Sequence, residues 1–145
     1  MREKALYLGL PALALSERMA IARGGGPGVI ERLRSDSDPK VIAALLENPR
    51  LTEALLAPMA SSESTPGVVL ALVAATERWA NRYSLRLAIA GNPGTPVEVA
   101  LGLLPGLQKR DLEQVGSDRR LQPAVRRRAD LLRGATTVDR GRSGD

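Results

Sequence analysis

A short corner rich in Asn, Pro, Gly and Thr recurs along this chain, and it constrains the fold more than any other feature. Its clearest copy is Asn92–Pro96, which lies between an apolar run ending at Gly91 and a second apolar run over residues 97–104. A glycine after a helix can adopt a left-handed conformation, and the first proline of the corner disfavours a helical conformation for the residue before it. The Thr-Pro pair supplies an N-cap and a residue suited to the first helical position. The corner therefore predicts one helix that ends at Gly91 and another that begins after it.

Related corners, each with a capping residue and often a proline, precede the other aliphatic runs. They predict a helix ending at Leu33 and further helices over 40–47, 53–60, 67–75, 97–104 and 122–133, after two N-terminal helices over 3–10 and 11–22. Residues 76–90 contain no Pro or Gly and predict the longest helical region, with a break expected near Asn81. Many of these helices are short, so we expect packing against neighbours to stabilise them.

The corners also set a register. Aligning Asn48, Ser62, Asn92 and Asp118 brings four aliphatic residues into equivalent positions as expected buried anchors: Leu55, Val69, Val99 and Val125. The corner at Asp38 is followed by one at Ser62, and the corner at Asn92 is followed by one at Asp118. Recurrence at this spacing is typical of a solenoid. We therefore expect one all-α domain, with capping helices over 1–23, stacked helical repeats over 24–133 and a disordered polar tail over 134–145.

Two stretches resemble the leucine-rich repeat variant family. The run Gly26–Pro49, with its Asp-Ser-Asp-Pro corner, and the run Asn92–Val99, with its Asn-Pro-Gly-Thr-Pro corner, are similar to the two alternating corner types of that family. The resemblance covers about residues 23–133 and implies a right-handed α-solenoid related to HEAT-like repeats. The founding type of the family carries a cysteine cluster for an iron–sulfur centre. This chain has no Cys, so that part of the resemblance does not carry over.

The composition excludes several kinds of chemistry. The 145 residues include no Cys and no His, which excludes thiol chemistry, thiolate or histidine metal sites and a Ser-His-Asp triad. We expect no catalytic residues, no cofactor and no metal. No apolar run is long enough to span a bilayer, and Glu3 and Pro11 interrupt a faint signal-peptide pattern. We therefore expect a cytoplasmic protein.

The charge is uneven along the chain. The net charge is +5, and residues 1–72 sum to zero, so residues 73–145 carry all of it. A basic half indicates an acidic partner, nucleic acid or an anionic surface, although a solvated basic surface is an equally good interpretation.

The long helical region contains an arginine-aromatic cluster. Two sets of side chains recur there at four-residue intervals: Arg78, Arg82 and Arg86, and Trp79 with Tyr83. In a continuous helix each set lies on one face, and the two faces adjoin. Trp, Tyr and Arg are enriched at protein interfaces, so we expect this cluster to contact a protein partner. The alternative is that the aromatic residues fill the core while the arginines extend along the surface.

A second cluster of cations lies near the C-terminus. It comprises Arg119, Arg120, Arg126, Arg127, Arg128 and Arg133. Arg119 and Arg120 stand at an expected helix start, where the helix dipole disfavours cations, so a nearby anion would explain them. No helix-turn-helix or zinc-finger pattern accompanies the cluster. The sequence thus predicts a non-catalytic binding or scaffold module with a protein partner, and nonspecific nucleic-acid binding through these residues is the alternative.

Overall fold

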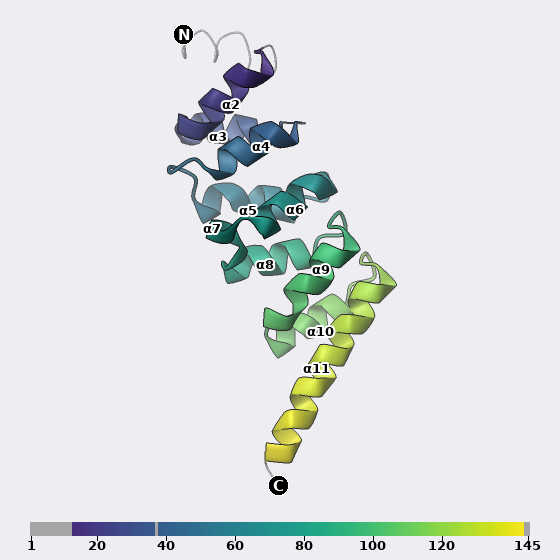
Figure 1. Ribbon diagram of the computed structural model, residues 1–145. Coiled ribbons are helices and arrows are strands. Elements are labelled where there is room, and N and C mark those ends of the chain that lie inside the picture. The colour runs from purple at the N-terminus through teal and green to yellow at the C-terminus, as the bar shows by residue number, and fades with distance from the viewer. Residues whose placement is uncertain (1–12, 37, 144–145) are drawn as a thin grey trace. The chain divides into compact units, whose positions relative to one another are not determined.

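The computed structural model describes residues 13–36 and 38–143, and the side chains within this part up to Gly134. The described residues form helices joined by short turns, with no strand among them (Figure 1). None of the described helices is both long and apolar enough to cross a membrane. The chain divides into two compact units, Met1–Met59 and Ala60–Asp145, and each is described by itself.

The first unit is built on three helices, α2 (Leu15–Gly24), α3 (Pro27–Leu33) and α4 (Pro39–Leu46), which contact one another, and it includes most of α5 (Glu53–Ser61). Helix α4 starts as the sequence predicts, because the Asp38 carboxylate accepts a hydrogen bond from the Lys40 N–H and Pro39 occupies the first helical position. Apolar side chains from α3, α4 and α5 form the core, and Ile30, Ile42, Leu45 and Leu56 are fully buried.

The second unit contains the remaining elements. They are α6 (Gly67–Ala75), α7 (Glu77–Ala80), α8 (Tyr83–Ala90), α9 (Val97–Leu103), the 3₁₀ turn η2 (Leu104–Gly106), α10 (Lys109–Ser117) and α11 (Pro123–Ser143). Helices α6, α7 and α8 each contact the next helix along the chain, and α11 contacts both α9 and α10. Val69, Leu70, Trp79, Leu85 and Leu104 are among the fully buried side chains of this unit.

Most helix boundaries agree with the sequence. The helix ending at Leu33 and those over 40–47, 53–60 and 67–75 lie within one residue of the predicted ends, and the break near Asn81 separates α7 from α8. Helix α10 was not predicted. Most of its residues are polar or charged, and its few apolar side chains, such as Leu112 and Val115, lie on its buried face. The predicted helix over 3–10 lies outside the described residues.

Two details of the Asn92–Pro96 corner correct the prediction. Gly91 does end α8, but its φ of −89° is not left-handed. Thr95 does not cap α9. Its hydroxyl donates instead to the Ile89 carbonyl at 2.6 Å, so it ties the corner back to the preceding helix, and Pro96 stands at the N-cap.

The predicted buried anchors are correct at two of four corners. Val69 and Val125 are buried, whereas Leu55 and Val99 are only half-buried. The consistent anchor lies eleven residues after the corner residues 48, 62, 92 and 118, and it is buried every time, as Met59, Val73, Leu103 and Ala129. The helices differ slightly in their orientation about their own axes, so the residue of the first turn that faces inward differs between corners. The residue eleven positions after the start of each corner faces inward in all four helices.

Helix α11 differs from the predicted disordered tail. Its backbone remains helical from Pro123 to Ser143. A single glycine such as Gly134 lowers helix propensity without ending a helix. The solenoid arrangement and its handedness remain predictions.

Candidate functional site

The corners of the two units share one polar device, which we call the asparagine clamp. In the first unit, the Asn48 side chain is fully buried. Its Nδ2 donates to the carbonyl oxygens of Ala22 and Gly25 at 2.8 and 2.9 Å, and its Oδ1 accepts from the Arg50 N–H at 2.8 Å. One amide therefore shapes its own turn and satisfies two carbonyls at the end of α2.

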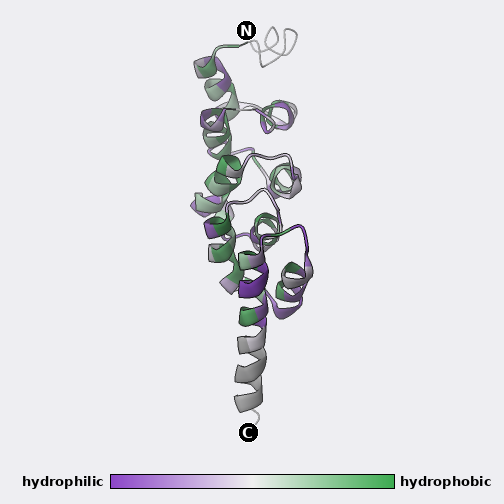
Figure 2. Ribbon diagram, turned by 90° about the vertical axis from the view of Figure 1, so that its right-hand side faces the viewer, coloured by the Kyte–Doolittle hydropathy of each residue, from purple (hydrophilic) through white to green (hydrophobic). Residues whose placement is uncertain are grey.

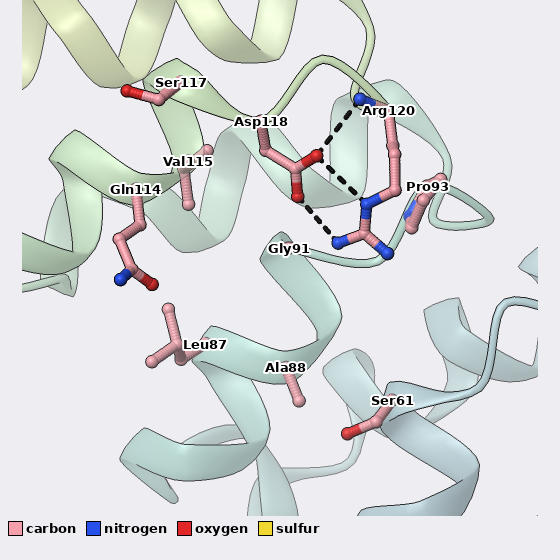
Figure 3. Close-up of a pocket in the computed structure, with 10 residues that line it drawn as sticks. All are labelled: Ser61, Leu87, Ala88, Gly91, Pro93, Gln114, Val115, Ser117, Asp118 and Arg120. Carbon is pink, nitrogen blue, oxygen red and sulfur yellow. Dashed lines mark hydrogen bonds and ion pairs between the residues drawn. The ribbon is translucent and has the colours of Figure 1, made fainter.

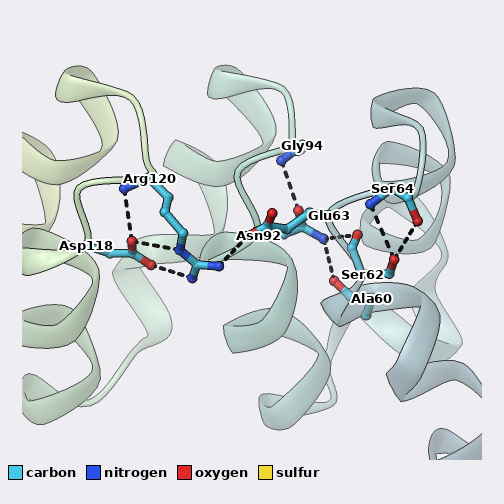
Figure 4. Close-up of polar contacts among 8 residues, drawn as sticks. All are labelled: Ala60, Ser62, Glu63, Ser64, Asn92, Gly94, Asp118 and Arg120. Carbon is cyan, nitrogen blue, oxygen red and sulfur yellow. Dashed lines mark hydrogen bonds and ion pairs between the residues drawn. The ribbon is translucent and has the colours of Figure 1, made fainter.

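The second unit repeats this device at Asn92. Its side chain is 4% exposed, its Nδ2 donates to the carbonyls of Ala60 and Ser62 at 2.8 and 2.9 Å, and its Oδ1 accepts from the Gly94 N–H at 2.9 Å (Figure 4). The clamp again joins a corner to the end of an earlier helix, here α5. Burying the amide is favourable because all of these hydrogen bonds are made.

The Ser62 and Asn92 corners approach closely enough to favour glycine at two positions. A Cβ on Gly94 would lie 3.3 Å from the Thr65 carbonyl oxygen, and a Cβ on Gly67 would lie 3.0 Å from the Gly94 carbonyl oxygen. These two glycines therefore permit the backbone contact between the corners.

The third corner of the second unit has Asp118 at the position of Asn92, and the first corner has Ser62 there. The Asp118 Oδ1 accepts from the Arg120 N–H at 3.0 Å, so the turn is the same. A carboxylate cannot donate, however, and no clamp to an earlier helix forms. Instead the Arg120 guanidinium binds both carboxylate oxygens, at 3.0 and 2.7 Å, and reaches Glu63 in the Ser62 corner (Figure 4).

These contacts govern the charges of the corner. The hydrogen bonds from Arg120 hold the pKa of Asp118 below its usual value. The hydrogen bond from Arg120 to Asp118, and to a smaller extent the one to Glu63, raises the pKa of Arg120 further above its usual range. The position of Arg119 and Arg120 before a helix predicts a nearby anion, and for Arg120 the anions are these two carboxylates.

A groove of about 460 Å³ lies where the third clamp is missing (Figure 3). We call it the α8–α10 groove, and its lining residues are Ser61, Leu87, Ala88, Gly91, Pro93, Gln114, Val115, Ser117, Asp118 and Arg120. Leu87, Ala88, Pro93 and Val115 give it an apolar wall. Three helices end at its edge, because Ser61 is the last residue of α5, Gly91 follows α8 and Ser117 is the last residue of α10.

The predicted arginine-aromatic cluster is divided by the break at Asn81, so its members do not form one helical face. Trp79 is 1% exposed, which decides the open alternative for this residue in favour of the core. The guanidinium carbons of Arg78 and Arg82 lie 4.4 and 5.8 Å from the Trp79 ring centroid, so both arginines cover it. Partner contacts by the exposed Arg78 and Arg82 remain predictions.

Tyr83 and Arg86, the other members of the cluster, hold helices together. The Tyr83 hydroxyl donates to Asp111 and accepts from the Gln108 N–H at 2.8 Å, which joins the start of α8 to the start of α10. Burial, followed by the hydrogen bond to Asp111, raises the pKa of Tyr83. Arg86 donates to the carbonyls of Ala80 and Leu103 at 3.3 and 3.1 Å.

The C-terminal cations are not equivalent either. Beside Arg120, the half-buried Arg126 donates to the Gly116 carbonyl at 3.3 Å, and Arg133 lies 4.0 Å from Glu113. Arg119, Arg127 and Arg128 are exposed. The start of α11, the lowest helix in Figure 2, accordingly shows a strongly hydrophilic band.

The sequence matches no protein-family model, no curated protein and no solved structure. The described residues also contain no cluster of three or more His, Cys, Asp or Glu side chains arranged to hold a metal ion.

Sequence reasoning interpreted Asn48 and Asn92 only as turn residues and missed the groove. The usable signal in the sequence is the aspartate at the first position of the Asp118 corner, where two other corners have asparagine and one has serine.

Proposed function

We propose that this chain is a non-catalytic helical-repeat module, of the leucine-rich repeat variant type, that binds a protein partner as a scaffold. The recurrence of the asparagine clamp in both units supports a repeat, because the same side chain makes the same set of hydrogen bonds at equivalent corners. A right-handed solenoid is the arrangement that we propose for these repeats.

The observation that carries the binding proposal is the α8–α10 groove. It combines an apolar wall with polar groups at its edge, which is the usual composition of a recognition site. A groove bounded by several helix ends suits an extended peptide segment, since the segment can place alternate side chains against the wall and the polar edge.

Peptide selection with a groove-blocking variant tests this proposal. A random 12-residue phage library is selected against the purified chain, and the enriched peptides are measured against Gln114→Trp and Val68→Trp. Both residues are exposed and uncharged, but only Gln114 lines the groove. We expect Gln114→Trp to weaken binding at least about tenfold and Val68→Trp to leave it unchanged. Selection without enrichment, or equal binding by both variants, contradicts the proposal.

A second candidate function is nonspecific nucleic-acid binding. It is favoured by the exposed arginines Arg119, Arg127 and Arg128, for which the described residues provide no ion pair. Such binding depends on phosphate neutralisation, so affinity for a labelled duplex should fall steeply with salt and fall further in a variant with all three residues changed to Ala. If the protein does not change the gel mobility of the labelled duplex at low salt, nucleic-acid binding is excluded as a function.

A further inference from the structure

We infer that this chain pairs with a second copy of itself through one exposed face of α9, η2 and α11. We call this surface the α9–α11 face, and it consists of six exposed residues: Glu98, Gly102, Pro105, Arg127, Arg128 and Leu131. None of the six lines the α8–α10 groove, so the inference goes beyond the proposed function. Three properties of the face support it: its geometry, the arrangement of its charges and the fit of its apolar residues.

The six residues lie on one side of two neighbouring helices. Helices α9 and α11 contact each other, and Figure 1 shows them side by side in front of α10 and running in the same direction. Counted from the corner residues Asn92 and Asp118, the exposed positions are 6, 10 and 13 in α9 and η2, and 9, 10 and 13 in α11. Position 11 is buried in both, as Leu103 and Ala129. Residues at this spacing share a helix face, so both exposed sets point away from the core.

The charged groups of the face are exposed on adjacent helices. Among the described residues, Glu98, Arg127 and Arg128 form no ion pair. Asp130, which lies between the cations and the leucine in the sequence of α11, is turned toward α10, where its carboxylate lies against Gly116. One carboxylate on α9 and two guanidinium groups on α11 are therefore available to a partner.

A two-fold axis makes this arrangement complementary to itself. An axis that runs along and between the two helices places α9 of each copy on α11 of the other. Glu98 then faces the first turn of α11 in the second copy, and Arg127 and Arg128 lie about one helical turn, or ~5 Å, further along. The two arginines meet α9 of the other copy rather than each other. Because a two-fold contact forms twice, it closes as a dimer.

The apolar residues of the face fit together in the same arrangement. Leu131 is 67% exposed and is one of two large hydrophobic side chains exposed in the described part of the chain. The axis places it opposite Pro105 and beside Gly102, where a Cβ would meet nothing within 4 Å. The glycine therefore leaves room for the leucine, and contact with the second copy removes the apolar surface of Leu131 from water.

Other ligands would use only part of this face. A nucleic-acid backbone is attracted to Arg127 and Arg128, but Glu98 repels its phosphates and Leu131 finds no apolar surface on it. A second copy of the chain is the partner that satisfies the carboxylate, the two cations and the leucine together.

Charge-swapped variants test the pairing on the full chain. Sedimentation equilibrium over a concentration series should show the wild type approaching twice the mass of one chain. Glu98→Arg places arginines opposite arginines, and the double variant Arg127→Glu with Arg128→Glu places carboxylates opposite Glu98. Each variant alone should dimerise at least about tenfold more weakly than the wild type. An equimolar mixture of the two should form dimers again, because both contacts of the mixed dimer join opposite charges, and this recovery also shows that both variants are folded.

An apolar variant and a control complete the experiment. Leu131→Ser removes the central apolar contact and should weaken dimerisation about tenfold. Glu31→Arg makes the same charge change as Glu98→Arg on the exposed surface of α3 in the first unit, and it should leave dimerisation unchanged.

The results that overturn the inference are specific. A wild-type chain that stays monomeric throughout the series overturns it, and so does a dimer that the charge variants leave unchanged or that their mixture fails to restore. A monomeric wild type that binds a labelled duplex, and loses this binding in the double arginine variant, overturns it and assigns the arginines to nucleic acid. The peptide-binding proposal is tested separately, because the groove and the α9–α11 face share no residue.

Discussion

The Asn92 and Asp118 corners have the same turn but opposite effects on the structure around them. In both, the first side chain accepts from the N–H two residues later, at 2.9 and 3.0 Å, and a helix begins five residues on, at Val97 and Pro123. Asn92 has an amide nitrogen where Asp118 has a second oxygen. The amide closes its corner onto α5, whereas the carboxylate recruits Arg120 and a groove remains.

In the repeat arrangement that we propose, this difference produces the candidate groove without any added element. An aspartate in place of an asparagine lacks the amide donor that makes the internal contact, and the groove beside Asp118 has an apolar wall. The Asn48 corner of the first unit is the reference for a closed corner, since its side chain is 0% exposed.

The largest effect is expected from converting a closed corner to the open type. Asn92→Asp removes the two hydrogen-bond donors that the Ala60 and Ser62 carbonyls accept from, and it places a carboxylate against these carbonyls. The free energy of unfolding should therefore fall by about 3 kcal/mol. Urea denaturation followed by circular dichroism measures this. Asn81→Asp is the matched control, because Asn81 is exposed and forms no clamp, and it should cost well under about 1 kcal/mol. Equal losses for the two variants would refute the clamp as the cause.

The far end of the α8–α10 pair is held by Tyr83, and breaking it tests whether the groove depends on that end. Tyr83→Phe removes the hydroxyl that joins Asp111 to the Gln108 N–H, and we expect a loss of about 1 kcal/mol.

The same variant changes the dependence of stability on alkaline pH. The folded pKa of Tyr83 lies above its usual value of 10.0, so its contribution is complete below pH 10 and is lost as the pH rises through the folded pKa. Denaturation of the wild type at neutral pH and near the folded pKa should reveal this loss, and Tyr83→Phe should not show it. If the free energy of unfolding depends on pH in the same way for both proteins, the alkaline loss does not come from Tyr83.

Packing between closed corners predicts a smaller effect. Gly94→Ala places a Cβ 3.3 Å from the Thr65 carbonyl oxygen and the Asn92 Oδ1, which should cost about 1 kcal/mol. Gly102→Ala is the control, since a Cβ at that position in α9 meets nothing within 4 Å and favours the helix. Thermal unfolding should therefore shift down for the first variant and slightly up for the second.

The smallest effect on stability is expected at the open corner itself. Asp118→Asn loses the partly exposed ion pair with Arg120 and gains an amide donor facing the groove, so the two changes oppose each other. The folded pKa of Asp118 lies below its usual value of 3.8, so its contribution is complete above that pH and is lost as the pH falls through the folded pKa. Thermal unfolding at neutral and acidic pH should show this acid dependence in the wild type and less of it in the variant. A large loss at neutral pH would mean that Asp118 is a structural residue like Asn92.

Local sequence determined where the helices begin and end. Asp38 with Pro39, and the corners at Ser62 and Asn92, act through turns and caps that span a few residues, so their effect can be deduced from neighbours in the chain. Helix α10 is harder to predict because most of its residues are polar and no side chain caps its start. Gly91 and Thr95 do not have the left-handed conformation and the capping role that the sequence predicts for them.

Only the tertiary structure decided which of these residues come together. Trp79 belongs to the core, and Tyr83 joins two helices, because the residues that they meet are brought near by packing. Asn92 reaches carbonyls 30 and 32 residues away, and Arg120 reaches Glu63 across 57 residues. Caps and turns are local, so the sequence specified them. Hydrogen bonds over such separations depend on how the helices stack, and this stacking determines whether a corner closes or leaves a groove.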